Sequence, residues 1–434
     1  MINQLCLKNR KLCFLVAGFL VLISVSIVTV TLMRISSSNE AKEESSLRFV
    51  SMVLRHGNRA PLFTYPSDPY ANRTIYWPEG EGELLNIGRR GLLKVGRFLR
   101  ERYGGFLPST FNASQVRTLS IEFNRCVDSA ECLLTGLYPL NGDHAPHNLS
   151  CRSFPISVVP REEDDMLLIF GRPCEKFVEE YKKAIDSYVF KQVEKKLDVL
   201  DYVSNNIGQK LNVSLDGFYM MGALYDTLFA QSKAGLELPE WTKKVFPEEL
   251  AFFINVLFSS MTQTPTQRRL NNGILINEIL STMEMRRSRG GDFNRLFDLF
   301  SATDLTIHSL WRSMGVRKTV PLPGYGATMI FELHEIAGNY FVKALYKNAA
   351  EDDELRTINF NGCENDEHHN QNNMCGLDTL RKLMENATIT DLDKECQMSE
   401  NFSCIRRIEL GLGMTSPVFR ICTNPALCVC LKKN

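Results

Sequence analysis

Two arginines and a histidine lie close together in segment 55–61, which reads Arg-His-Gly-Asn-Arg-Ala-Pro. An arginine guanidinium donates paired hydrogen bonds to phosphate oxygens, and it keeps its charge at physiological pH. A neutral imidazole such as that of His56 is a nucleophile near its usual pKa of about 6.5. Gly57 lets the backbone approach a ligand closely, and Pro61 ends regular structure. These residue types predict a site that binds an oxyanion and holds a nucleophile against it.

A short, mostly apolar segment, Phe49 to Leu54, comes directly before these residues. Its composition predicts a β-strand that is buried on both faces. Ligands of open α/β sheets bind at the carboxyl ends of the strands. We therefore expect segment 55–61 at such an end. An Arg-His pair taken alone would instead be read as a basic loop that happens to contain a histidine.

A second strand is predicted over Gln115–Ser120, and Arg125 follows it just before a helix from about Val127 to Leu137. The start of a helix attracts anions through its free N–H groups, and an arginine there adds a formal positive charge. We expect Arg125 to join the oxyanion site. The alternative is an arginine on the exposed surface of a helix.

A third strand is predicted over Leu299–Ala302, followed by Thr303, Asp304 and a helix over Leu305–Gly315. A carboxylic acid at this place could protonate a leaving alkoxide. An aspartate before a helix is also a common N-cap, which stabilises the helix by roughly 1 kcal/mol. Thr303 could cap the helix equally well. From the spacing alone, capping is the favoured role of Asp304.

The pattern R-H-G-x-R-x-P after an apolar strand resembles the signature of the histidine acid phosphatases. The resemblance covers about residues 47–390. It implies an α/β histidine-phosphatase fold over residues 47–434, with a central, mostly parallel sheet flanked by helices. It also implies an inserted, mainly helical second region at about 151–285. Helical periodicity at Glu175–Leu200 and Pro247–Met261 agrees with such an insertion.

The resemblance also implies a role for each site residue. His56 takes the phosphoryl group as a phosphohistidine, and Asp304 protonates the leaving group. The phosphate-binding residues are Arg55, Arg59 and Arg125.

This chain has Thr303 where the family has a histidine that donates to the phosphoryl group. Losing one charge-assisted hydrogen bond costs about 1.5–3 kcal/mol, or roughly 10- to 150-fold in rate. We expect hydrolysis of small phosphomonoesters at acidic pH that is attenuated by Thr303. The alternative is a phosphatase-like ectodomain that binds anionic ligands or partners without turnover. The pair His334-Glu335 resembles a replacement, but it lies in a predicted hairpin over Ile330–Tyr346, and we interpret it as structural.

The 434 residues include 50 basic and 50 acidic side chains, and 44% of the residues are hydrophobic. A chain of this composition has a sizeable core. Its neutral balance gives no support for nucleic-acid binding, so any anion site must be local.

Residues 12–33 are 22 consecutive residues without a charge. At about 1.5 Å per residue, a helix of this length crosses a roughly 30 Å hydrocarbon core. Lysine and arginine residues precede it, which predicts a signal anchor with a cytosolic tail at 1–11 and a stalk at 34–46. The domain would then be lumenal (endosomal or lysosomal) or extracellular. A cleaved signal peptide is the alternative.

The chain holds 13 cysteines, of which eleven follow the predicted anchor. They lack clean zinc spacing, and we expect structural disulfides of an oxidising compartment, with Cys174 among the candidates. Because eleven is odd, at least one thiol is free or pairs between chains. Cys363 and Cys375 resemble a loop disulfide of the family. The resemblance also suggests a homodimer.

Six N-x-S/T sequons fit a glycosylated ectodomain: Asn72, Asn112, Asn148, Asn212, Asn386 and Asn401. The polar segment 364–369 contains His368 and His369 among acidic residues. It has no fixed ligand spacing, and we interpret it as a solvated loop. We therefore expect neither a metal ion nor a cofactor.

Overall fold

The computed structural model describes residues 46–140, 151–161, 163–167, 174–316, 322–364 and 373–396, and the backbone of strands β9 (Phe402–Ile405) and β10 (Val429–Lys432). One compact unit spans Arg48–Asn434. The predicted tail, anchor and most of the stalk lie outside the described residues, as do Asn148, Asn401, His368 and His369. Among the helices that are described, none combines the length and apolar character needed to cross a bilayer.

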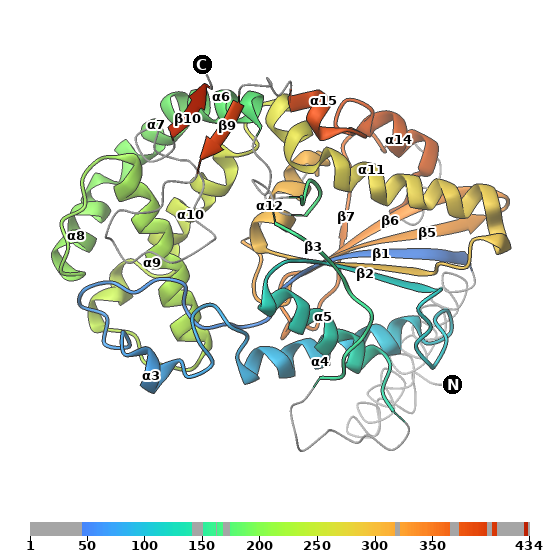
Figure 1. The fold of residues 1–434 in the computed structure, drawn as a ribbon, viewed down its shortest axis with the longest axis horizontal. Coiled ribbons are helices and arrows are strands. Elements are labelled where there is room, and N and C mark those ends of the chain that lie inside the picture. Colours follow the sequence, from blue (N-terminus) through green and yellow to red (C-terminus); the bar gives the residue numbers. More distant parts are fainter. Residues whose placement is uncertain are drawn as a thin grey trace, which may run out of the picture. The chain divides into compact units, whose positions relative to one another are not determined.

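A mixed sheet forms the centre of the fold, in the order β3-β2-β4-β1-β5-β6-β7, with β8 paired to β6 (Figure 1). The strands are β1 (Leu47–Arg55), β2 (Val116–Ile121), β3 (Ser157–Val159), β4 (Phe297–Ala302), β5 (Thr328–Ile336), β6 (Asn339–Lys347), β7 (Arg356–Ile358) and β8 (Cys375–Gly376). The pairs among β1, β4, β2 and β3 are parallel, and those of β6 with β5, β7 and β8 are antiparallel. The half of the sheet around β1 is therefore the parallel half.

The predicted strands at 49–54, 115–120 and 299–302 are confirmed as β1, β2 and β4. Every residue of β4 and all but one of β1 are buried, as expected for strands covered on both faces. The predicted hairpin is β5 and β6. Its two turn residues, Ala337 and Gly338, have positive φ angles of 50° and 80°, which match the twist of the flanking strands.

Helices cover both faces of the sheet (Figure 1). Helix α4 (Asn86–Tyr103) and helix α5 (Asn124–Leu137) lie together on one face, and α11 (Pro265–Arg289), α12 (Asp304–Ser313) and α14 (Leu377–Met384) lie on the other. Gly96 and Gly136 allow α4 and α5 to touch, since a Cβ at Gly96 would stand 2.0 Å from the Leu133 carbonyl oxygen. This contact fixes the position of α5, which carries Arg125.

A mainly helical region packs around its own apolar core, which includes Phe218, Phe253 and Leu257. Its helices are α6 (Glu175–Ala184), α7 (Phe190–Val193), α8 (Leu197–Asn206), α9 (Leu215–Lys233) and α10 (Glu248–Ser260). A π-helical turn at Ile185–Val189 interrupts the stretch that we expected to be helical from 175 to 200. Strand β3, within the expected insertion 151–285, joins the edge of the sheet instead.

Helix α11 belongs to both cores. Leu270 packs in the core of the helical region, whereas Leu275, Ile276 and Ile279 pack against the sheet. Its first turn is closed by a capping box in which Thr264 and Gln267 bond each other's backbone.

Three disulfides are described: Cys132–Cys151, Cys174–Cys396 and Cys363–Cys375. The second links the start of α6 to α15 (Leu392–Cys396). Cys126 is a free, buried thiol. Glycosylation stays a prediction, although the described sequon asparagines Asn72, Asn112, Asn212 and Asn386 are all exposed.

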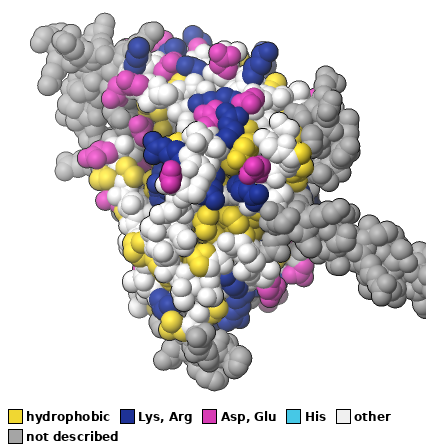
Figure 2. Space-filling model, turned by 90° about the vertical axis from the view of Figure 1, so that its right-hand side faces the viewer, with side chains coloured by type: hydrophobic (Ala, Val, Ile, Leu, Met, Phe, Trp, Pro, Cys, Tyr) yellow, Lys and Arg dark blue, Asp and Glu magenta, His cyan; other side chains and the backbone are white. Residues whose placement is uncertain are grey.

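One face of the molecule is seen in Figure 2, where basic and acidic side chains of the described residues lie next to one another. No broad area of a single sign is visible among them in that view. This pattern agrees with the balanced composition of the chain.

Candidate active site

The parallel half of the sheet brings the predicted site residues to one edge. Arg55, the last residue of β1, stands opposite Ala302, the last residue of β4. The N–H of His56 donates to the carbonyl oxygen of Ala302 at 3.2 Å. Strand β2 runs parallel on the other side of β4, and α5 with Arg125 follows it. The segments that follow these three strands therefore lie side by side.

The imidazole of His56 is buried, with 2% of the residue exposed. Its Nδ1 lies 2.9 Å from the carbonyl oxygen of Gly57. Because a carbonyl oxygen only accepts, Nδ1 carries the proton and Nε2 keeps its lone pair. Burial lowers the pKa of His56 well below its usual value, and the charges of Arg125, Arg55 and Arg59 lower it further, against the bond to Gly57. The ring therefore stays neutral in mildly acidic solution.

Arg125 lies in the first turn of α5, and only 5% of it is exposed. Its guanidinium lies over the ring of Phe123, 4.2 Å from the ring centre. Burial lowers the pKa of Arg125 to about 10. Its Nε is buried without a hydrogen-bond partner, and no carboxylate forms an ion pair with it among the described residues. Arg125 is thus a buried cation that the described part of the chain leaves uncompensated.

Arg55 and Arg59 each face a carboxylate. Arg55 Nη2 lies 2.7 Å from Asp304 Oδ2, and its guanidinium lies over the ring of Tyr325 at 4.5 Å. Arg59 Nη2 donates to both oxygens of Asp226, at 2.8 and 3.0 Å. Burial alone would lower the pKa of Arg59, but Asp226 outweighs it and raises the pKa. The two pairs hold the guanidinium planes in place, and the Nε of each arginine has no hydrogen-bond partner.

The interpretation of Asp304 as an N-cap is wrong, because Thr303 caps α12 and Asp304 is its first residue. Thr303 Oγ1 accepts from the N–H of Thr306, and the Thr306 hydroxyl accepts from the N–H of Thr303. The N-cap is therefore Thr303, and the Asp304 carboxylate accepts from the N–H of Leu305 through Oδ1 at 2.9 Å while its Oδ2 faces Arg55.

The hydroxyl proton of Thr303 is also engaged. Thr306 Oγ1 lies 3.0 Å from the carbonyl oxygen of Leu167, to which its single proton must be donated. In the 3.1 Å contact between the two hydroxyls, Thr303 is therefore the donor. Thr303 uses its acceptor and its donor capacity within the start of the helix.

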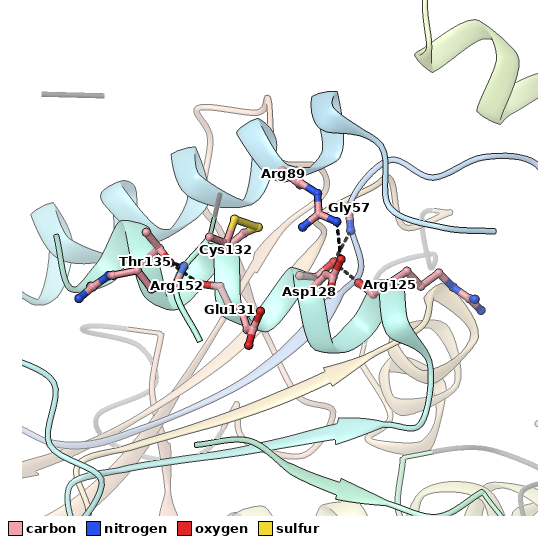
Figure 3. The surroundings of a disulfide bond; sticks show 10 residues. Gly57, Arg89, Arg125, Asp128, Glu131, Cys132, Thr135 and Arg152 are labelled. Carbon is pink, nitrogen blue, oxygen red and sulfur yellow. Dashed lines mark hydrogen bonds and ion pairs between the residues drawn. A yellow bond between two sulfur atoms is a disulfide. The ribbon is translucent and has the colours of Figure 1, made fainter. Parts of the chain in front are cut away.

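Ser129, Asp226 and Tyr325 were missed by the sequence analysis. Ser129 Oγ accepts from the N–H of Gly57 at 3.0 Å and donates to the Arg125 carbonyl oxygen at 2.5 Å. Figure 3 labels Gly57 and Arg125, the two residues that Ser129 joins, with the disulfide of Cys132 farther along α5. The residues around Asp226 give no local signal, since its partner Arg59 lies 167 positions earlier.

Comparison with known proteins gives a consistent result. The family model described as "Histidine phosphatase superfamily (branch 2)" matches residues 46–236. Lysosomal acid phosphatase of Homo sapiens is 30% identical over 361 residues, which cover 82% of this chain and 81% of that protein. Prostatic acid phosphatase of Mus musculus is 28% identical over 389 residues, covering 88% of this chain and 94% of that protein.

Solved structures share the fold. The phytase of Citrobacter braakii superposes with a TM-score of 0.61 at 14% identity, covering 81% of this chain and 99% of that one. At this identity the likeness concerns the arrangement of helices and strands. It shows that the mixed sheet with helices on both faces is a fold that this chain shares with that phytase.

Proposed function

Because the chain belongs to the histidine phosphatase superfamily (branch 2), we propose that it is an acid phosphatase that hydrolyses small phosphomonoesters through a phosphohistidine. The observation that carries the proposal is the surroundings of His56. The imidazole is buried and neutral, and its Nε2 carries the lone pair. The positive charges of three buried guanidinium groups lower its pKa. One of them, Arg125, has no carboxylate partner among the described residues. A phosphoryl dianion supplies the charge that this set of groups lacks.

In the first step, the three arginines hold the phosphoryl oxygens and His56 Nε2 attacks phosphorus. The P–N bond forms while the P–O bond to the leaving group breaks. The Nδ1–H to Gly57 bond keeps the imidazole in the tautomer that has its lone pair on Nε2. Charge that moves onto the phosphoryl oxygens is stabilised by fixed guanidinium donors, the main contribution of proteins to phosphoryl transfer.

Asp304 is the proposed proton donor to the departing alkoxide. Its carboxylate contacts Arg55 Nη2 in the free chain. A phosphoryl group bound at Arg55 replaces Asp304 as the partner of this charge, and Asp304, protonated from the acidic solution, donates its proton to the leaving oxygen. In the second step, water attacks the phosphohistidine, Asp304 accepts its proton, and His56 is released.

Thr303 supports attenuation of this activity. The family has a histidine at this position, and the Thr303 hydroxyl is occupied by the helix cap. One charge-assisted hydrogen bond to the phosphoryl group is then missing, at a cost of roughly 10- to 150-fold in rate. The same observation favours the second candidate function, a phosphatase-like domain that binds anions or partners without turnover.

The test is hydrolysis of p-nitrophenyl phosphate by the full chain made through a secretory route, from about pH 4 to about pH 7. We expect measurable turnover that His56→Ala lowers by more than about a thousandfold. Thr303→His should raise kcat roughly 10- to 150-fold.

Thr303→Ser is the matched control, because serine keeps the cap and adds no charge. It should leave kcat unchanged. Circular dichroism would show whether each variant is folded. If the parent chain and Thr303→His are both folded and both hydrolyse at background rates, the enzymatic function is excluded and the binding function remains.

The relatives named lysosomal and prostatic acid phosphatase support a lysosomal or extracellular location. We propose that the chain reaches it as a single-pass membrane protein anchored by residues 12–33. The homodimer stays a prediction.

A further inference from the structure

A pocket of about 330 Å³ opens beside Arg125. Its apolar lining is formed by Leu62 and Phe123, which are both buried. The backbone at Gly82 lies close to the Arg125 guanidinium, since a Cβ built on Gly82 would stand 3.6 Å from Arg125 Nη1. The pocket therefore borders one of the groups proposed to hold the phosphoryl group. Arg125 is the one proposed site residue among those that line the pocket.

Three glutamates, Glu81, Glu83 and Glu122, line the same pocket. Glu81 forms an ion pair with Arg73. Glu83 accepts a hydrogen bond from the side-chain amide of Asn124 at 3.2 Å, a neutral donor.

Glu122 accepts from the backbone N–H of Arg161 at 3.0 Å, again a neutral donor. The guanidinium of Arg161 lies over the Phe123 ring, 4.9 Å from its centre. No ion pair of Glu83 or Glu122 occurs within the described part of the chain. Glu83 and Glu122 thus line the pocket together with Arg125, and neither forms an ion pair among the described residues.

The charges at the phosphoryl site are nearly balanced before substrate binds. Asp304 offsets Arg55, and Asp226 offsets Arg59, so that Arg125 supplies the net positive charge. A phosphoryl dianion brings two negative charges to this site. The surroundings of the leaving group are then negative on balance, and the two glutamates add to this.

We propose that this pocket receives the leaving group and that Glu83 and Glu122 select one with a positive charge. The substrate class is a phosphomonoester of an amino or quaternary ammonium alcohol, whose phosphate binds the arginines and whose cation faces the glutamates. The inference rests on the proposed function and refines its substrate. Substrates with further anionic groups on the leaving side are disfavoured by the same two carboxylates.

Two esters of equal shape test it: phosphocholine and 3,3-dimethylbutyl phosphate, which differ in the charge of the terminal group. For the parent chain, we expect kcat/KM for phosphocholine to be about fivefold higher, the effect of two exposed ion pairs. The ratio should fall toward one in about 0.5 M salt, because exposed charges are screened.

In a Glu83→Gln, Glu122→Gln double variant the ratio should also fall to about one, while p-nitrophenyl phosphate is hydrolysed at the parent rate. Glu101→Gln, an exposed glutamate on α4 outside the pocket, is the matched control and should keep the ratio. A parent ratio near one, or a ratio that survives in the double variant, overturns the inference while leaving the phosphatase activity standing.

Calorimetric binding of the two esters to His56→Ala separates the inference from the proposed function, since it needs no turnover. Tighter binding of phosphocholine supports the pocket even in a chain without phosphatase activity. Equal affinities for the two esters overturn the inference whatever the catalytic result.

Discussion

Two buried clusters of imidazole, guanidinium and carboxylate groups are built on the same sheet. One surrounds His56 at the end of β1. The other lies in the middle of β5, where Glu332 accepts hydrogen bonds from Arg102 at 2.7 and 3.0 Å and from Tyr103 at 2.6 Å. The imidazole of His334 lies 3.3 Å from the second oxygen of Glu332.

The clusters differ in how far their charges and hydrogen bonds are satisfied. Burial would raise the pKa of Glu332, but the hydrogen bond from His334 and the charge of Arg102 outweigh it and lower the pKa to about 2. At His56 the guanidinium groups exceed the paired carboxylates, and three buried Nε atoms have no hydrogen-bond partner. The same residue types thus form a closed structural network in one place and, in the other, the open set of donors that we propose as an anion site. What distinguishes them is the surplus of donors and positive charge.

Removing one carboxylate from each cluster should have opposite consequences, and this is the largest of the effects that distinguish the two clusters. Glu332→Gln breaks the ion pair of the buried Glu332 with the half-buried Arg102, and should lower the free energy of unfolding by about 3 kcal/mol with turnover per folded chain almost unchanged. Asp226→Asn releases Arg59 from its fixed orientation and should lower kcat/KM about a hundredfold. Urea unfolding and p-nitrophenyl phosphate kinetics on both variants measure the two effects.

If Glu332→Gln lowered turnover as strongly as Asp226→Asn, the cluster on β5 would be part of the catalytic machinery. The comparison of a closed and an open cluster would then fail.

Acidification should lower the stability of the folded chain through two buried histidines, His308 and His56. His308 is buried on α12, and burial, followed by the charge of Arg312, lowers its pKa to about 3. The unfolded chain binds a proton at this residue below about pH 6.5 and the folded chain does not, so stability is lost as the pH falls. His56 acts in the same direction.

The free energy of unfolding should therefore fall by about 1 kcal/mol per pH unit through His308 between about pH 6 and pH 5, and His56 adds to the fall. Glu332 contributes little in this window, because its unfolded pKa of 4.5 lies below it. His308→Gln should remove its share of the slope, measured by urea unfolding at the two pH values. An unchanged slope would show that His308 takes up a proton in the folded chain.

Two hydroxyl groups on α5 provide the finest comparison. Ser129 and Thr135 each donate to the carbonyl oxygen four residues earlier, and each accepts a backbone N–H from a distant segment (Figure 3). Only Ser129 accepts from Gly57. Ser129→Ala leaves that N–H unpaired beside His56 and should lower kcat about tenfold, whereas Thr135→Ala should not change it.

The pH profile of kcat separates a positioning role of Ser129 from general destabilisation. Loss of positioning lowers kcat at every pH, and Ser129→Thr, which keeps the hydroxyl, should restore it. Equal kcat losses in Ser129→Ala and Thr135→Ala would mean that the hydroxyl on α5 matters only for stability.

Much of this site could be predicted because its residues follow strands. The local sequence predicts both the apolar strand and the reactive residues Arg55 and His56 at its end. Arg125 and Asp304 were predicted in the same way, because each follows a predicted strand. The cap could not be assigned in advance. Thr303 and Asp304 are equally good caps, and the contact of Asp304 with Arg55 decided between them.

Asp226 and the pocket glutamates depend on tertiary packing. Asp226 lies inside α9, where an acidic residue has no periodicity that distinguishes it from a solvated one. It becomes the partner of Arg59 only because the helical region covers this edge of the sheet. Glu83 and Glu122 lie in separate loops that meet at Arg125, and no spacing in the chain indicates that meeting.

The continuity of α11 has a consequence for how substrate enters. This helix runs unbroken for 25 residues and contributes side chains to both cores, so the two layers share one stiff rod. Enzymes that clamp shut on their substrates need a hinge between their lobes, formed by a few residues that absorb large changes of φ and ψ. Here the continuous helix α11 connects the two cores at the place where a hinge would be needed. A phosphomonoester would then bind to a preformed site. It would reach this site by diffusion, without closure of one lobe onto the other.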